Sequence, residues 1–142
     1  MHADPLSALA DRLRALASPT RLRILLALRD GALCVCQLAA VLDLSEPEVA
    51  GDLAVLLRAG IVGQLRRGRF ASYVLHRRDE AVPWLRLVAR QSAGDPQAAA
   101  DLERATRIRL VPPEMVVAST GCEPAAGMAL GQPDETGPRT PL

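Results

Sequence analysis

Residues 34–60 read CVCQLAAVLDLSEPEVAGDLAVLLRAG, and no other part of the chain specifies the architecture so closely. The apolar spacing of residues 34–42 predicts a short helix followed by a tight connection. Ser45 is a favourable N-cap for a second helix, and Glu48 completes a capping box with it. Gly60 is a natural residue just past the end of that helix. The segment therefore predicts a helix-turn-helix.

After residue 60 the spacing of the apolar residues changes from a helical to a strand-like pattern. Residues 61–66 and 70–75 read as two short strands joined at Arg67-Gly68-Arg69, so they predict a β-hairpin with a basic tip. A hairpin behind a helix-turn-helix is the wing of a winged helix. Guanidinium groups at this tip can grip phosphates or enter a minor groove of DNA.

Further helices are expected on both sides of this unit. Residues 5–17 carry an amphipathic pattern, and a second helix opens at Ser18-Pro19 and stops at Asp30-Gly31. Residues 81–90 and 95–110 return to a helical pattern. The fold class is therefore mainly α with a small β-hairpin, a winged helix-turn-helix. We expect one domain over residues 1–110 and a flexible Pro/Gly-rich tail over residues 111–142.

Arginine supplies every fixed positive charge. The chain has 142 residues, with 17 arginines, no lysine and 16 acidic residues, for a formal net charge of +1. Residues 1–78 hold 11 arginines against 7 acids, whereas residues 110–142 hold one arginine against four acids. This distribution suits modest binding of a polyanion by the front half. Aromatic residues make up only 2%, which disfavours recognition of single-stranded nucleic acid by stacking.

Targeting and catalytic patterns are not recognisable in the sequence. It has neither a signal-peptide pattern nor an apolar run of about 18 residues, so we expect a cytoplasmic protein that does not span a membrane and whose thiols stay reduced. Three cysteines in that compartment indicate ligands, a redox device or packing rather than a disulfide framework. No Ser/His/Asp or Cys/His set, paired-carboxylate motif or phosphate loop stands out, so an enzyme is not expected.

Cys34 and Cys36 are two of the three cysteines and stand one residue apart at the start of the helix-turn-helix. Two thiols at this separation can bind one soft ion together. Alternatively they pack as small apolar side chains, because free cysteine is among the most buried residue types. Residues i and i+2 do not share a face of a regular helix. We therefore expect an ion held by both thiols to unwind or tilt the helix start.

Several blocks together resemble the ArsR/SmtB family of arsenic- and metal-responsive winged-helix repressors. The match covers roughly residues 6–90, and its blocks are LASPTRLRIL (16–25), LCVCQL (33–38), LSEP (44–47), LAVLLRAGIV (53–62) and GRFASYVL (68–75). The resemblance implies a homodimer joined through its first and last helices. It also implies binding to double-stranded operator DNA and release by an inducer.

In the arsenic-responsive branch, the pattern Leu-Cys-Val-Cys carries the sensing cysteines. The resemblance therefore assigns Cys34 and Cys36 to As(III), as arsenite or methylarsenite, or to Sb(III), with no required cofactor. The branch often has a third cysteine three residues later, where this chain has Ala39. Cys122 can complete a three-sulfur site from the same or the other subunit, whereas a methylated arsenical needs only two sulfurs.

The resemblance places the DNA-contacting positions at the start of the second helix of the helix-turn-helix and on the wing. These positions are Ser45, Glu46, Pro47, Glu48, Ala50, Gly51, Arg66, Arg67 and Arg69. The family usually carries Gln, Ser/Thr, Arg/Lys and His on the exposed face of this helix, where the present chain has Glu46, Glu48, Ala50, Gly51 and Asp52. Carboxylates repel phosphates, although they can accept a hydrogen bond from cytosine. The DNA surface is therefore selective, relies on the arginine wing, or has lost operator binding.

Three other interpretations stay open on the sequence. One is a soft-metal sensor of the same family for cadmium, lead or zinc. The chain has only His2 and His76, which disfavours a site built from histidines and carboxylates at a dimer interface. Another is a thiol-redox sensor, in which a bridge to Cys122 is less strained than one within Cys34-Val35-Cys36. The last is an arsenical-binding protein that has lost its DNA affinity.

Overall fold

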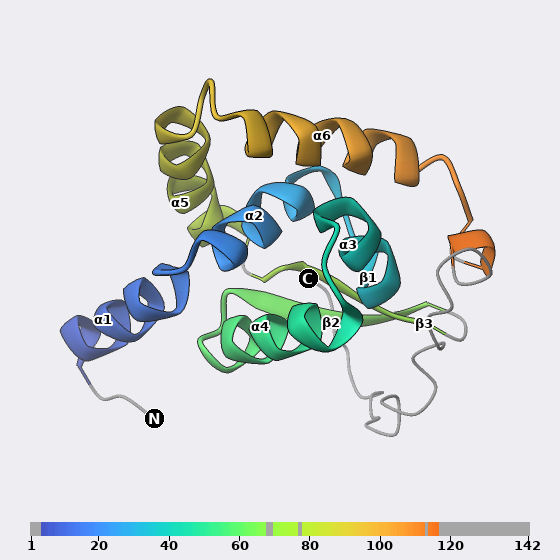
Figure 1. The fold of residues 1–142 in the computed structure, drawn as a ribbon. Helices are drawn as coiled ribbons and strands as arrows, with labels where there is room; N and C mark the ends of the chain where they lie inside the picture. Colours follow the sequence, from blue (N-terminus) through green and yellow to red (C-terminus); the bar gives the residue numbers. More distant parts are fainter. Residues whose placement is uncertain (1–3, 68–69, 77, 113, 117–142) are drawn as a thin grey trace.

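A computed structural model of the chain describes residues 4–67, 70–76, 78–112 and 114–116. It has a mainly helical body and a small antiparallel sheet (Figure 1). The helices are α1 (Pro5–Leu16), α2 (Pro19–Ala27), α3 (Val35–Leu42), α4 (Glu46–Arg58), α5 (Arg78–Gln91) and α6 (Pro96–Ile108), with a 3-10 turn η1 (Leu28–Asp30) after α2. The strands are β1 (Leu33–Cys34), β2 (Val62–Arg67) and β3 (Phe70–Leu75). The predicted fold class is confirmed.

The predicted helix-turn-helix is formed by α3 and α4. Asp43 adopts a left-handed conformation at φ 57° and ends α3. Ser45 then caps α4: the backbone N–H of Glu48 donates to its Oγ at 3.3 Å, and its own N–H donates to Glu48 Oε1 at 3.2 Å. Both helices bury their apolar faces in one core with α2 and the sheet. Its fully buried members include Ile24, Leu25, Leu38, Val41, Val49, Leu53 and Leu56.

The sheet contains one strand that the sequence did not predict. Its order is β1-β3-β2, with β1 antiparallel to β3 so that Leu33 pairs with Tyr73 and Cys34 with Ser72. In the hairpin β2–β3, Arg66 lies opposite Ala71 and Arg67 opposite Phe70, so β2 extends one residue into the expected connection. A strand of two residues is too short to show a period, and its partner lies about 40 residues away. Cys34 therefore joins the sheet of the wing directly to α3.

The flanking helices match the expected ones except at their boundaries. Ser18 caps α2, which passes into η1 and stops at Gly31, whose φ of 136° favours glycine. The α5 helix begins three residues before the expected start at residue 81 and contains Pro83. The α1 helix extends away from the rest of the molecule (Figure 1). Among the described residues, none of the helices has the length and apolar character needed to cross a membrane.

The last helix, α6, is fastened to the body by a buried carboxylate. Asp101 is 3% exposed and accepts two hydrogen bonds from Arg23 of α2, at 2.7 and 2.9 Å, and one from Arg104 at 3.2 Å. The same guanidinium groups donate to the last carbonyls of α3: Arg23 to Leu42 at 2.7 Å and Arg104 to Val41 at 2.6 Å. This clamp holds the end of α3 beside the turn. In Figure 1, α6 lies on the side opposite to α4 and the hairpin.

The chain after α6 returns to the body before the described part ends. Residues 114–116 form one helical turn, and Val116 is buried. The remainder of the expected tail, residues 117–142 with Cys122, lies outside the described residues. The boundary at residue 110 and the flexibility of the tail stay predictions. The packing of Val116 was not expected from the sequence.

Candidate thiol site and DNA-binding face

The two cysteines of the CVC motif lie side by side in the folded chain. Cys34 Sγ and Cys36 Sγ are 3.3 Å apart, and each residue is 2% exposed. Cys34 is the last residue of β1 and the N-cap of α3, with an extended backbone at φ −85° and ψ 171°. The pair is therefore a preformed dithiol at a strand-to-helix junction.

This geometry corrects the expectation that one ion would have to distort the helix start to reach both sulfurs. That expectation assumed that both cysteines are helical, but Cys34 is extended and only Cys36 lies within α3. The backbone N–H of Cys34 donates to Gln37 Oε1 at 2.9 Å, which fixes the cap conformation. Sequence reasoning did not single out Gln37, although its place three residues after the N-cap is the position of a capping-box partner.

The environment favours the thiolate form of Cys34. A hydrogen bond from the Cys36 thiol, more than any other contact, lowers the pKa of Cys34 from 9.0 to about 7. Burial opposes this shift, and the backbone N–H groups of Gln37 and Cys36 at the start of α3 add to it. Thiolates are the form that binds soft ions and attacks electrophiles. Near neutral pH the thiolate form of Cys34 is therefore appreciably populated.

We expect the rate of alkylation of Cys34 by iodoacetamide to rise with pH about a midpoint near 7. Cys36→Ala removes the donated hydrogen bond, so the midpoint should move upward toward 9.0. Cys36→Ser keeps a donor and should retain a lower midpoint. Peptide mass spectrometry separates Cys34 from Cys122. The same midpoint in Cys36→Ala and wild type would contradict the assigned cause.

An apolar cover lies over the two sulfurs. Val116, 2% exposed, shares a buried cluster with Cys34 and Cys36, and Ala40, Ile108 and Val111 pack around them. Within the described part of the chain, no group of three or more His, Cys, Asp or Glu side chains is arranged to hold a metal ion. Cys122, the predicted third ligand, lies outside that part. The described site therefore supplies two sulfurs and an apolar surround.

The start of α4 presents most of the predicted DNA-contacting residues to solvent. Ser45, Pro47, Glu48, Ala50 and Gly51 are exposed, and Glu46 is half-buried. A Cβ added to Gly51 would meet no atom within 4 Å, so this glycine does not serve internal packing. At the start of α4, the exposed face is therefore formed largely by small side chains.

Two of the carboxylates that the sequence placed on this face have partners within the fold. Asp52 is half-buried and accepts a hydrogen bond from Arg21 of α2 at 2.9 Å, so it is not the exposed acidic residue expected there. Glu48 accepts from both the backbone N–H and the hydroxyl of Ser45. These pairings partly offset the negative charge of the helix. Repulsion of phosphate is consequently weaker than the composition of α4 implies.

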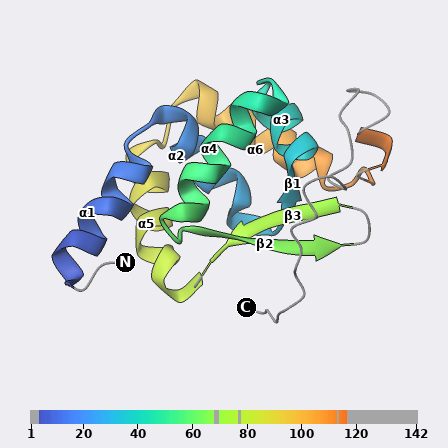
Figure 2. The same cartoon turned by 90° about the horizontal axis from the view of Figure 1, so that it is seen from below.

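Two of the predicted wing arginines, Arg66 and Arg67, belong to β2. Arg66 is exposed on β2 and lies opposite Ala71 of β3. Arg67 is the last residue of β2. Arg69 lies outside the described residues. In Figure 2, α4 and the hairpin lie on the same side of the molecule.

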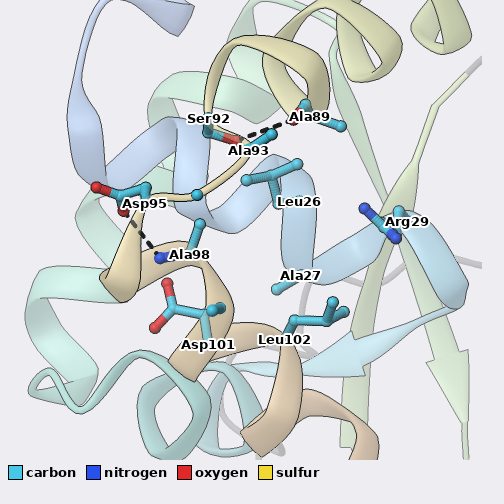
Figure 3. A pocket seen from close by; sticks show the side chains of 12 residues that line it. Leu26, Ala27, Arg29, Ala89, Ser92, Ala93, Asp95, Ala98, Asp101 and Leu102 are labelled. Carbon is cyan, nitrogen blue, oxygen red and sulfur yellow. Dashed lines mark hydrogen bonds between the residues drawn. The ribbon is translucent and has the colours of Figure 1, made fainter.

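A separate cavity of about 220 Å³ lies where α2 meets the connection between α5 and α6 (Figure 3). Its wall is mainly apolar, with Leu26, Ala27 and Leu102 beside Asp95 and Asp101. The sulfur pair does not contribute to this wall. Small-molecule sites usually enclose about 300–1,000 Å³, and the Asp101 carboxylate is already bonded to two arginines. We assign no ligand to this cavity.

Comparison with known proteins identifies similar regulators. The family model described as "Bacterial regulatory protein, arsR family" matches residues 18–63. The arsenic resistance transcriptional regulator ArsR1 of Pseudomonas putida is 45% identical over 64 residues, which are 44% of this chain and 50% of that protein. The chain spans about half the length of the curated relatives it matches.

Two solved structures have a similar fold. The cadmium sensor CMTR of Mycobacterium tuberculosis is 42% identical, with a TM-score of 0.50 over 56% of this chain and 82% of that one. Reduced HlyU of Vibrio cholerae is 30% identical, with a TM-score of 0.56 over 61% of this chain and 90% of that one. The curated relatives are named as transcriptional regulators, not enzymes.

Proposed function

Because the chain belongs to the ArsR family of bacterial regulatory proteins, we propose that it represses transcription by binding operator DNA as a homodimer, and that a trivalent arsenical on Cys34 and Cys36 releases it. The observation that carries the proposal is the dithiol itself. Its sulfurs lie 3.3 Å apart at the junction of β1 and α3. One ion at this junction contacts both the sheet of the wing and the helix-turn-helix.

The sulfur separation favours a pyramidal ion. With bonds of about 2.3 Å, a tetrahedral zinc ion holds two sulfurs about 3.8 Å apart. The observed 3.3 Å corresponds to an angle of about 90° at an ion with bonds of that length. Trivalent arsenic has a lone pair and narrow bond angles, so it fits the pair with less movement than tetrahedral zinc requires. Arsenite or methylarsenite, or Sb(III), is therefore the inducer we propose.

Cys122 is the proposed third ligand for an inorganic arsenical. Val116 shares a buried cluster with Cys34 and Cys36, and Cys122 follows it by six residues. Six residues span at most about 20 Å when extended. The tail of the same subunit is therefore long enough to bring its thiol back to Cys34 and Cys36.

Operator DNA is proposed to bind across α4 and the wing. The exposed face of α4 offers few side chains that donate hydrogen bonds, so base readout is expected to be limited and phosphate contacts by the wing arginines to dominate. The proposed homodimer joins through α1 and α5, the first and last helices of the stretch that resembles the family, roughly residues 6–90. Leu6 and Leu13 of α1 and Leu87 of α5 are exposed by 77%, 49% and 52%, and burial against a second copy would remove this apolar surface from water.

Binding to DNA from upstream of the gene, measured by fluorescence anisotropy, tests the proposal. Arg66→Ala should weaken binding on all sequences alike and reduce the slope of log K against log salt by about 0.9 per lost phosphate contact. Arg107→Ala is the control, because that exposed arginine belongs to α6, which lies on the side opposite to the hairpin (Figure 1). Arsenite should release the wild type under reducing conditions, and light scattering should give a dimer. No binding without arsenite would refute the repressor and leave an arsenical-binding protein.

A thiol-redox sensor is the second candidate, and the lowered pKa of Cys34 supports it. A thiolate is the form that oxidants attack. The two candidates differ in what releases the DNA: hydrogen peroxide, reversed by dithiothreitol, for a redox sensor, and arsenite in the presence of reductant for the arsenical sensor. Release by cadmium or lead alone would instead indicate a soft-metal sensor of the same family.

A further inference from the structure

The cover over the dithiol is apolar, so an ion bound to both sulfurs would face apolar side chains. Val116 is buried directly with the two sulfurs, and Ile108 and Val111 pack beside it. The segment between α6 and Val116 is anchored by Arg109, whose guanidinium donates to the carbonyls of Ala27 at 3.1 Å and Gly31 at 2.7 Å. The cover is therefore held in place by contacts within the fold.

A trivalent arsenical bound to two thiolates keeps one further substituent. For arsenite that substituent is a hydroxyl, and for a monosubstituted organic arsenical it is a carbon group. A hydroxyl buried against apolar side chains without a hydrogen bond is unfavourable, whereas a methyl group gains from the same burial. Two buried polar side chains lie near the pair: Gln37, which accepts from the Cys34 N–H at 2.9 Å through its Oε1, and Ser72, which pairs with Cys34 across the sheet.

We propose that Val116 makes the dithiol selective for monosubstituted organic trivalent arsenicals over arsenite, an inference that rests on the arsenical-sensing function above. Methylarsenite, CH3As(OH)2, reacts with the thiols of Cys34 and Cys36 to form two As–S bonds. Two As–O bonds break and two waters leave, with no change of oxidation state. The methyl group then lies against the cover. Arsenite bound by the same two sulfurs places its remaining hydroxyl against the cover instead.

Titration of methylarsenite and arsenite into matched variants tests this selectivity. In Cys122→Ser, methylarsenite should bind about tenfold or more tightly than arsenite, because the third thiol is gone. In Cys122→Ser/Val116→Thr, the cover keeps its shape and gains a hydroxyl, so the ratio of the two Kd values should fall about tenfold. Met115→Thr in the same turn changes a side chain that is 60% exposed and should leave the ratio unchanged.

The outcomes separate this inference from the proposed function. Equal binding of the two arsenicals to Cys122→Ser overturns the selectivity alone, as does an equal ratio in the Val116→Thr and Met115→Thr backgrounds. Ser72→Ala should change neither affinity, and selective loss of arsenite binding there would show that Ser72 holds the hydroxyl, against the proposal. If neither arsenical binds the wild type, the proposed function fails and this inference fails with it. Thermal unfolding of each variant confirms that the fold is kept.

Discussion

Replacing Cys34 and Cys36 together by serine should leave operator binding at the wild-type level and raise the arsenite concentration needed for release by about 100-fold or more. The reason is that the double variant removes both sulfurs of the described site while keeping its local structure. Serine is a better N-cap than cysteine, so the Cys34→Ser change preserves the start of α3. Anisotropy titrations of DNA-bound protein with arsenite measure the shift.

Cys122→Ser is the matched control for this experiment. It should raise the arsenite concentration for release by a smaller factor, because two of the three proposed ligands remain. Release of the double variant at wild-type arsenite concentrations would place the inducer elsewhere in the chain. Normal DNA binding by the double variant is part of the prediction, since it separates loss of sensing from loss of folding.

Asp101→Ala is expected to lower the free energy of unfolding by about 3–5 kcal/mol. The carboxylate is 3% exposed and bridges Arg23 and Arg104, so its removal leaves two partly buried guanidinium groups without their anion. Small domains have only about 5–15 kcal/mol of stability. A loss of this size should be evident in urea denaturation followed by circular dichroism.

Glu103→Ala on the same helix provides the comparison. Glu103 pairs with Arg107 at 3.3 Å, but both side chains are about 70% exposed. An exposed pair contributes about 0–1 kcal/mol because water and salt screen it. If the two alanine variants were equally stable, the clamp on the end of α3 would not contribute to stability as its burial indicates.

The sequence was sufficient for the helix-turn-helix and the hairpin, because caps and periodicity are local signals. It was insufficient where contacts join distant segments. The two-residue strand β1 has no period of its own and is recognisable only from its pairing with β3. Asp52 looked like an exposed acid because its partner, Arg21, lies 31 residues earlier in the chain.

The cover over the thiols is another feature that could not be predicted from local sequence patterns. Val116 lies in a proline-rich stretch that has no helical pattern, and its burial depends on α6 placing it beside α3. The proposed Cys122 ligand and the Arg69 contact lie outside the described residues, so both stay predictions. The close approach of the two sulfurs depends on a single extended residue, Cys34, which the helical pattern concealed.

Cys34 belongs to the wing's sheet and to the first helix of the helix-turn-helix at once, and this has a consequence for building biosensors from regulators of this kind. A graft of the CVC motif alone would carry the sulfurs into a host that lacks the opposing strand holding Cys34 extended. A graft of a foreign hairpin would replace Ser72, the residue opposite Cys34. Residues 33–75 are therefore the smallest module to transplant as one piece.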